Sequence, residues 1–168
     1  MKKEGGVELE AAAMARNIQL QFISMPLAME SMEIELAQGE AKPLKVEAPT
    51  REFSTAYHVQ LQEAWAVGQS AIGEGRKRIF TAYGQAPAPK MAKQVVLLVR
   101  KGELNADGVT VIPIESGPGH FGGGSIFMMN IAKVDIGCEL GEEKFVLAPG
   151  EFRLVTPRLG EGKSVSIQ

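Results

Sequence analysis

The stretch "NIQLQFIS", residues 17–24, decides the fold because its apolar residues recur at every second position. In an extended chain Ile18, Leu20 and Phe22 share one face, and the Asn and Gln side chains between them share the other. This period of two predicts a β-strand with one buried face and one solvated face. The same period returns in "MEIEL" (32–36), "AYHVQLQ" (56–62) and "KVDIGCEL" (133–140), and more briefly around Phe145, Phe152 and Val165.

Two further segments predict the places of their strands within a sheet. "VVLLV", residues 95–99, is apolar throughout and predicts a central strand that is covered on both faces. Pro113, inside "VTVIPIE" (109–115), lacks the N–H that a strand ladder needs. We therefore expect that strand at a sheet edge or at a bulge. Glycine- and proline-rich turns separate the strand-like runs at intervals of roughly ten residues, which favours a sandwich or barrel.

These patterns predict an all-β fold, an antiparallel β-sandwich of the Ig-like or jelly-roll-like kind with about eight to ten strands. One domain is expected over residues 17–168, since a chain of 168 residues suffices for one core. Residues 1–16 are expected to form an N-terminal tail or a short helix. Their segment "VELEAAAMAR" (7–16) is helical in composition but too short to be stable unless it docks on something.

Charge and hydropathy exclude several classes of partner. The net charge is −2 and the 18 Lys and Arg residues are spread along the chain, so no nucleic-acid partner is predicted. No run approaches the ~18 apolar residues of a membrane span. The N-terminus starts with two lysines, but Glu4, Glu8 and Glu10 interrupt any apolar run after them, so no signal peptide is predicted.

The glycine-rich stretch "SGPGHFGGGSIFMMN", residues 116–130, invites comparison with phosphate-binding loops. Such loops lead into a helix whose N-terminus holds the anion, whereas residues 125–132 alternate like a strand. We therefore expect a connection between strands and no cofactor. His120 in this loop and His58 on a polar strand face lack a carboxylate at a telling spacing, so neither a catalytic nor a metal site is predicted.

The remaining candidates for a site are few. Cys138 cannot form an intrachain disulfide, and its place on an apolar strand face predicts a small buried thiol. Trp65, Tyr83 and His120 are the candidate ligand-binding residues. Trp65 is flanked by alanines, which favours a core or rim position over an exposed platform for a sugar. For Asn130 we expect a structural role, with neighbouring backbone groups satisfying its amide.

Residues 125–157 resemble the C-terminal part of uncharacterised bacterial β-sandwich proteins, many of them exported. The shared landmarks are a strand that ends in Asn130, a strand that reaches Gly141, and a Leu-x-Pro-Gly turn at Leu147, Pro149 and Gly150. "AYHVQLQEAWAVG", residues 56–68, is similar to an earlier piece of that pattern. The resemblance implies a β-sandwich and an extracytoplasmic location, and it transfers no functional residue.

Three functions follow as hypotheses. The first is a non-catalytic module with a structural or protein-interaction role and a protein partner, which predicts an exposed apolar patch or an open sheet edge near Pro113. The second is a module that binds a small ligand or a carbohydrate, with Trp65 or Tyr83 exposed beside a concave face. The third is a hydrolase whose site is not visible in the sequence, which needs His58 or His120 next to an acid in a cleft.

Overall fold

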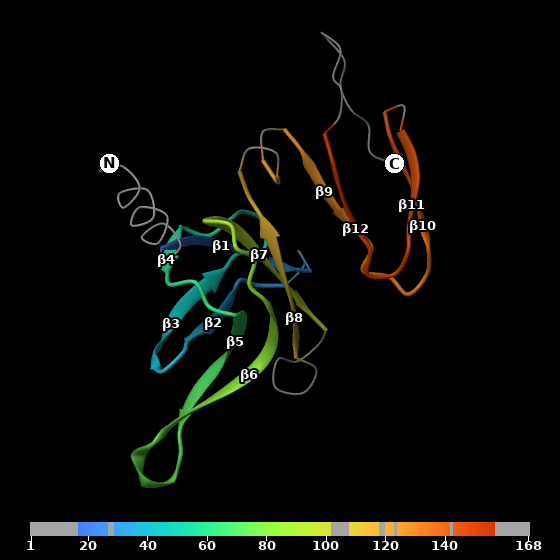
Figure 1. Cartoon of the computed structure of the whole chain (residues 1–168). Coiled ribbons are helices and arrows are strands. Elements are labelled where there is room, and N and C mark those ends of the chain that lie inside the picture. The colour runs from blue at the N-terminus through green and yellow to red at the C-terminus, as the bar shows by residue number, and fades with distance from the viewer. Residues whose placement is uncertain are drawn as a thin grey trace, which may run out of the picture. The chain divides into compact units, whose positions relative to one another are not determined.

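Figure 1 shows the computed structural model, which describes residues 17–26, 29–101, 108–117, 120–122, 124–141 and 143–156. These ranges contain twelve strands and one 3-10 turn, η1 (Glu74–Arg76). The all-β prediction is confirmed. The expected helix at 7–16 and the strand around Val165 lie outside the described residues. The chain divides into two compact units, residues 1–115 and 116–168, which we call the sandwich unit and the ribbon unit. The prediction of one domain over 17–168 stays a prediction.

The sandwich unit contains two four-stranded sheets. The first has the order β4-β1-β7-β8, with β4 (Tyr57–Val59), β1 (Ile18–Met25), β7 (Lys93–Arg100) and β8 (Val109–Glu115). The second has the order β3-β2-β5-β6, with β3 (Ala41–Ala48), β2 (Met32–Gln38), β5 (Ala64–Ile72) and β6 (Arg78–Pro87).

Both sheets contribute to a single hydrophobic core, so their inner faces are packed against each other as in a sandwich. The alternation seen in the sequence sets this face, because in β1 every second residue is buried and the residues between them are half-buried. Fully burying one large side chain of this kind stabilises a fold by about 1.5–3 kcal/mol. The core residues are Ile18, Leu20, Phe22, Met32, Ile34, Leu36, Val46, Ala48, Val59, Trp65, Val67, Val96, Leu98, Val109 and Val111.

The first sheet confirms the central position predicted for residues 95–99 and the edge position predicted for Pro113, but Leu97 and Val99 are half-buried, so β7 is not fully covered on both faces. β7 lies between β1 and β8, and it contributes Val96 and Leu98 to the core. β8 is an end strand, and its Pro113 is opposite Val96 of β7. The sheet departs from the expected antiparallel pattern in one pair, since β1 and β7 run parallel. A parallel pair requires a long crossover connection, and here that connection includes all four strands of the second sheet.

The second sheet explains part of the difference between twelve strands and the eight to ten expected. β3, β5 and β6 were not anticipated as strands. In β3 the apolar residues alternate only from Leu44 to Ala48, after Lys42 and Pro43; in β6 every residue is exposed or half-buried, and no clear period of two is present. Both are end strands of their sheet. Lysine and proline are common on such strands because they discourage pairing with another chain.

At one side of the sandwich the end strands β6 and β8 approach closely. A Cβ atom built on Gly84 of β6 would be 1.9 Å from the carbonyl oxygen of Val109 in β8. Gly108 repeats the arrangement, since its Cβ would be 2.7 Å from the carbonyl oxygen of Tyr83. Glycine is required at both positions because any side chain would displace the neighbouring backbone.

The ribbon unit consists of two two-stranded antiparallel ribbons in its described residues. One pairs β9 (Ile126–Met129) with β12 (Phe152–Val155), and the other pairs β10 (Ile136–Leu140) with β11 (Glu143–Leu147). Only Leu140, Leu147 and Val155 are buried apolar residues among its described residues. The glycine-rich loop joins strand β8 to strand β9, as expected for a connection between strands.

Asn130 is the buried polar centre of the ribbon unit and confirms the structural role expected of it. Its Nδ2 donates hydrogen bonds to the carbonyl oxygens of Val134 at 2.7 Å and Leu147 at 2.8 Å. Its Oδ1 accepts the N–H of Ala132 at 2.8 Å, and its backbone bonds with Gly150 and Glu151. One amide therefore ties three segments of the unit together.

Candidate functional site

Trp65 belongs to the core, and the alternative of an exposed sugar platform is wrong. The side chain is fully buried, and its indole Nε1 donates a hydrogen bond of 2.7 Å to Gln94 Oε1. The Gln94 amide in turn donates to the carbonyl oxygens of Pro89 and Met91, each at 2.8 Å. Two inward-facing polar groups thus satisfy each other, and Trp65 has no surface left for a ligand.

Tyr83 and His120 are both half-buried. Tyr83 lies on β6, is packed against the core, and its hydroxyl lies 3.0 Å from Gln69 Oε1. His120 lies in the ribbon unit, where its backbone N–H donates to the carbonyl oxygen of Gly117 at 3.0 Å. A ligand-binding role for these two residues stays a prediction.

His58 and Cys138 show no reactive arrangement in the described part of the chain. His58 is exposed, and no hydrogen bond joins it to a carboxylate of a described residue. Cys138 is half-buried rather than buried, which corrects the expectation. The reason is that β10 pairs only with β11, so one side of its apolar face stays open at Ile136. Among the described residues, no group of three or more His, Cys, Asp and Glu side chains could hold a metal ion.

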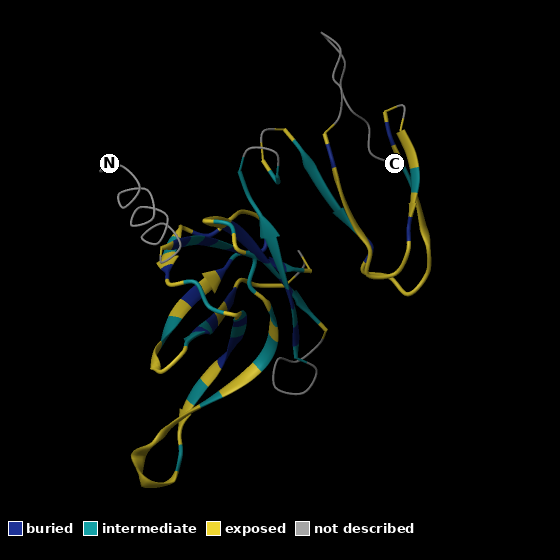
Figure 2. Cartoon of the chain, in the orientation of Figure 1, coloured by how far each residue is buried: buried dark blue, intermediate teal, exposed yellow. Residues whose placement is uncertain are grey.

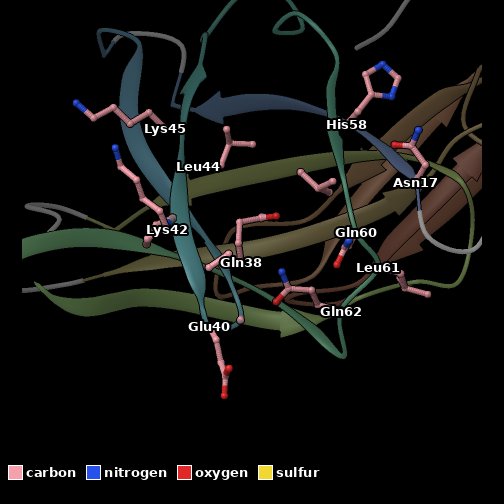
Figure 3. A pocket seen from close by; sticks show the side chains of 14 residues that line it. Asn17, Gln38, Glu40, Lys42, Leu44, Lys45, His58, Gln60, Leu61 and Gln62 are labelled. Carbon is pink, nitrogen blue, oxygen red and sulfur yellow. The ribbon is translucent and has the colours of Figure 1, made fainter.

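A groove of about 1080 Å³ lies between β3 and the segment that begins with β4 (Figure 3). Figure 3 shows Leu44 directed from β3 toward the segment that carries His58 and Gln60, while Lys42 and Lys45 project to the other side of β3. Side-chain amides, aliphatic groups and two lysines line the groove, and none of Trp65, Tyr83 and His120 does. The lining residues are Asn17, Gln38, Gly39, Glu40, Ala41, Lys42, Pro43, Leu44, Lys45, His58, Val59, Gln60, Leu61 and Gln62.

Part of this polar lining already has a structural role. The Nε2 atoms of Gln38 and Gln62 both donate to the carbonyl oxygen of Ala37, each at 3.1 Å. Glu40 is the one acid that lines the groove. The groove can therefore offer amide donors to a polar ligand, but its lining includes no Phe, Tyr or Trp side chain on which a sugar ring could stack.

The ribbon unit presents a different kind of surface. On one face of the β9–β12 ribbon, Met129 is paired with Phe152, and Phe127 with Leu154. We call these four residues the apolar ribbon face. Phe152 is 59% exposed and Leu154 is 37% exposed, while Phe127 and Met129 are half-buried. The rings of Phe127 and Phe152 stack with centroids 5.4 Å apart.

The opposite face of the same ribbon is directed toward the β10–β11 ribbon. There Arg153 lies over the ring of Phe145, 4.4 Å from its centroid, and forms an ion pair of 3.4 Å with Glu143. Val155 is buried on this face. The ribbon therefore has apolar side chains on both faces, but only one of them is covered. The alternation of Phe152 and Leu154 in the sequence indicated a buried face and gave no sign that this face is open.

Comparison of the sequence with protein-family models gave no match, and comparison with curated proteins gave none. In the described part of the chain, no helix has the length and apolar character needed to cross a membrane.

Proposed function

We propose that this chain is a non-catalytic β-sandwich module with a protein-interaction role, and that the apolar ribbon face contacts its protein partner. The observation that carries the proposal is the exposure of Phe152 and Leu154 next to Phe127 and Met129 on one ribbon face. Large apolar side chains that gather on an exposed face are characteristic of interaction surfaces.

Physical reasoning supports a partner for this face in particular. An isolated two-stranded ribbon is marginally stable in water, because it buries too little apolar surface. Contact with a protein surface would cover Phe152 and Leu154 and would stabilise the ribbon at the same time. Exposed aromatic rings supply much contact area and lose little conformational entropy, so they often dominate binding energy.

The test begins with a photo-crosslinking amino acid at position 152 of the full chain in its native cell. The captured protein is then purified, and its affinity for the chain is measured by calorimetry. We expect the double variant Phe152→Lys/Leu154→Lys to bind at least about tenfold more weakly, because it places two charges in an apolar contact.

Val146→Lys is the matched control, since Val146 is equally exposed but lies on β11 of the other ribbon. It should leave the affinity within about twofold. Equal binding of the double variant contradicts the proposal. So does crosslinking of position 152 only to residues 17–115 of the same chain, because the face is then covered internally.

The groove of the sandwich unit favours a second candidate, a module that binds a small polar ligand or a carbohydrate. Its support is the volume of about 1080 Å³ and the amide side chains that line it. Titration with a panel of soluble oligosaccharides should then shift the NMR side-chain amide signals of Gln60 and Gln62. Unchanged signals across the panel count against carbohydrate binding in the groove. The third hypothesis, a hydrolase, gains no support from the groove, because no hydrogen bond joins His58 to a carboxylate of a described residue.

A further inference from the structure

The β5–β6 hairpin extends beyond the sheet to which it belongs. β2 pairs with β5 at Val67 and Gly68, and beyond Gly68 β5 pairs with β6 alone, as far as Ile72 opposite Arg78. We call residues 69–81 the hairpin arm. Figure 1 shows the arm projecting from the sandwich, and Figure 2 shows that most of it is exposed.

The tip of the arm combines apolar and cationic side chains that have no partner among the described residues. Ile72 is 77% exposed and Ile79 is 55% exposed. Arg76, Lys77 and Arg78 follow one another in the sequence, are all exposed, and form no ion pair with a described residue. Glu74 is the only carboxylate of the arm, so three cations and one anion give the arm a net charge of +2.

An acidic pocket lies at the root of the same arm, where β5 diverges from β2. It has a volume of about 450 Å³, and Gln69 and Ser70 of the arm form part of its wall. Three carboxylates and one lysine line it, which gives a net charge of −2; these residues are Glu33, Glu35, Glu47 and Lys45. The Oε2 atom of Glu35 and the hydroxyl of Ser70 are buried without a hydrogen-bond partner among the described residues.

We propose that the hairpin arm docks on a second copy of this chain, with its basic tip in the acidic pocket at the root of the partner's arm. Two arms that lie side by side in antiparallel fashion place each tip beside the other root. The arm spans about six residues from Ser70 to Gly75, or about 20 Å at the rise of a strand. A two-fold axis between the arms makes both contacts identical, as in an isologous dimer.

The charges and the exposed apolar side chains both favour the arm of a second copy as the partner of the acidic pocket. The net charge of +2 on the arm matches the net charge of −2 around the pocket, so association lowers the electrostatic energy of both copies. Antiparallel packing of the arms also removes Ile72 and Ile79 from water. An incoming guanidinium could donate to Glu35 Oε2, which has no donor among the described residues of its own chain.

The test is sedimentation equilibrium of the full chain from about 1 to about 200 μM, in low and in high salt. We expect a monomer–dimer equilibrium that weakens at high salt, because exposed charges are screened. Arg76→Glu/Arg78→Glu should weaken dimerisation by at least about tenfold, and Glu33→Lys/Glu47→Lys should do the same, because each places like charges together.

Mixing the two double variants gives the decisive measurement. In each double variant alone, the arm and the pocket carry net charges of the same sign and repel each other. In a pair that contains one copy of each variant, the arm and the pocket carry opposite charges at both contacts. We therefore expect the equimolar mixture to form a heterodimer with an affinity close to that of the original chain. The matched control is Arg51→Glu/Lys90→Glu, which reverses two exposed cations outside the arm and should leave dimerisation unchanged.

The inference is independent of the proposed function, because the apolar ribbon face lies in the other unit. Phe152→Lys/Leu154→Lys should therefore leave the dimer intact even where it abolishes partner binding. A chain that is monomeric over the whole concentration range overturns the inference, and so does failure of the mixture to associate. Arm-dependent binding of the monomer to phosphatidylglycerol vesicles or to duplex DNA would assign the arm to another occupant.

Discussion

The sandwich unit and the ribbon unit are both built from strands in their described residues, yet they bury very different numbers of apolar side chains. In the sandwich unit the two sheets enclose one core of fifteen buried residues. The described part of the ribbon unit buries three apolar residues around a single asparagine. Two stacked sheets cover each other's inner faces, whereas narrow ribbons leave one face open. The comparison shows that an alternating strand indicates an apolar face without indicating what covers it.

The two units also use buried polar groups differently. In the sandwich unit, Trp65 belongs to a large core, and the hydrogen bonds of the buried Trp65–Gln94 pair hold the loop before β7. In the ribbon unit, the Asn130 amide joins three segments that share few apolar contacts. Hydrogen bonds therefore supplement the packing in the first unit and replace much of it in the second. The predictions below challenge or refine this contrast.

The largest effect is expected in the sandwich core. Trp65→Ala should lower the free energy of unfolding by about 4 kcal/mol, because it creates a cavity and leaves Gln94 Oε1 without its donor. Urea denaturation followed by circular dichroism measures the change. Ile72→Ala is the control, with a change below about 0.5 kcal/mol because Ile72 is exposed. If the two variants lost similar free energies of unfolding, the core and the arm would not differ in their contribution to stability.

The next effect concerns the ribbon unit. Asn130→Ala should destabilise it by about 3 kcal/mol, because the buried carbonyl of Leu147 and two further backbone groups lose their partner. Hydrogen exchange should show about 100-fold less protection for amides of residues 126–155, with little change in β1 and β7. Unaltered exchange in the ribbons would contradict the structural role of Asn130. A uniform loss over both units would show that they unfold together.

A smaller effect on stability is expected where β6 and β8 lie close together at one side of the sandwich. Gly84→Ala should cost about 2 kcal/mol, since its Cβ would clash with the carbonyl oxygen of Val109. Gly137→Ala in β10 is the matched control, because nothing lies within 4 Å of its Cβ. Thermal unfolding of both variants gives the comparison. Equal stability of the two would mean that β6 and β8 can separate at little cost.

The smallest effect distinguishes the two faces of one strand. Leu154→Ala should change stability by less than about 0.5 kcal/mol, whereas Val155→Ala, one residue further on, should cost about 1.5 kcal/mol. Leu154 belongs to the exposed apolar ribbon face, and Val155 is directed toward the other ribbon. Chemical denaturation of the ribbon unit, monitored by hydrogen exchange, measures both. A larger cost for Leu154→Ala would show that the ribbon face is covered in the isolated chain.

The sequence predicted the elements that have a clear local signal. The alternation at Ile18, Leu20 and Phe22 gave the buried face of β1, and Pro113 placed β8 at a sheet edge. The sequence also predicts the structural role of Asn130, whose side-chain amide takes part in three hydrogen bonds. The strand period and the missing N–H of proline are local properties, and an asparagine among turn residues is commonly bonded to backbone, although the partner Leu147 lies 17 positions away.

The features that the sequence did not predict have a common physical origin. The sequence does not indicate β6, because an end strand that is only partly covered lacks a sharp alternation, and in β3 the alternation is confined to residues 44–48, after Pro43. Cys138 was expected to be buried because its strand alternates, but a two-stranded ribbon leaves part of that face open. The acidic pocket joins residues from β2, β3, β4 and β5, which are separated by up to 37 positions, so no local motif could reveal it.

By itself, the sequence of this protein determined an all-β chain, the inner face of its principal strands, and several turn and edge positions. Only the tertiary structure decided which strands pair, that β1 and β7 run parallel, that Trp65 is fully enclosed, and that the arm and the apolar ribbon face are exposed. The physical reason is that a side-chain pattern is a property of neighbouring residues. Burial, in contrast, depends on which distant segment comes to lie on top.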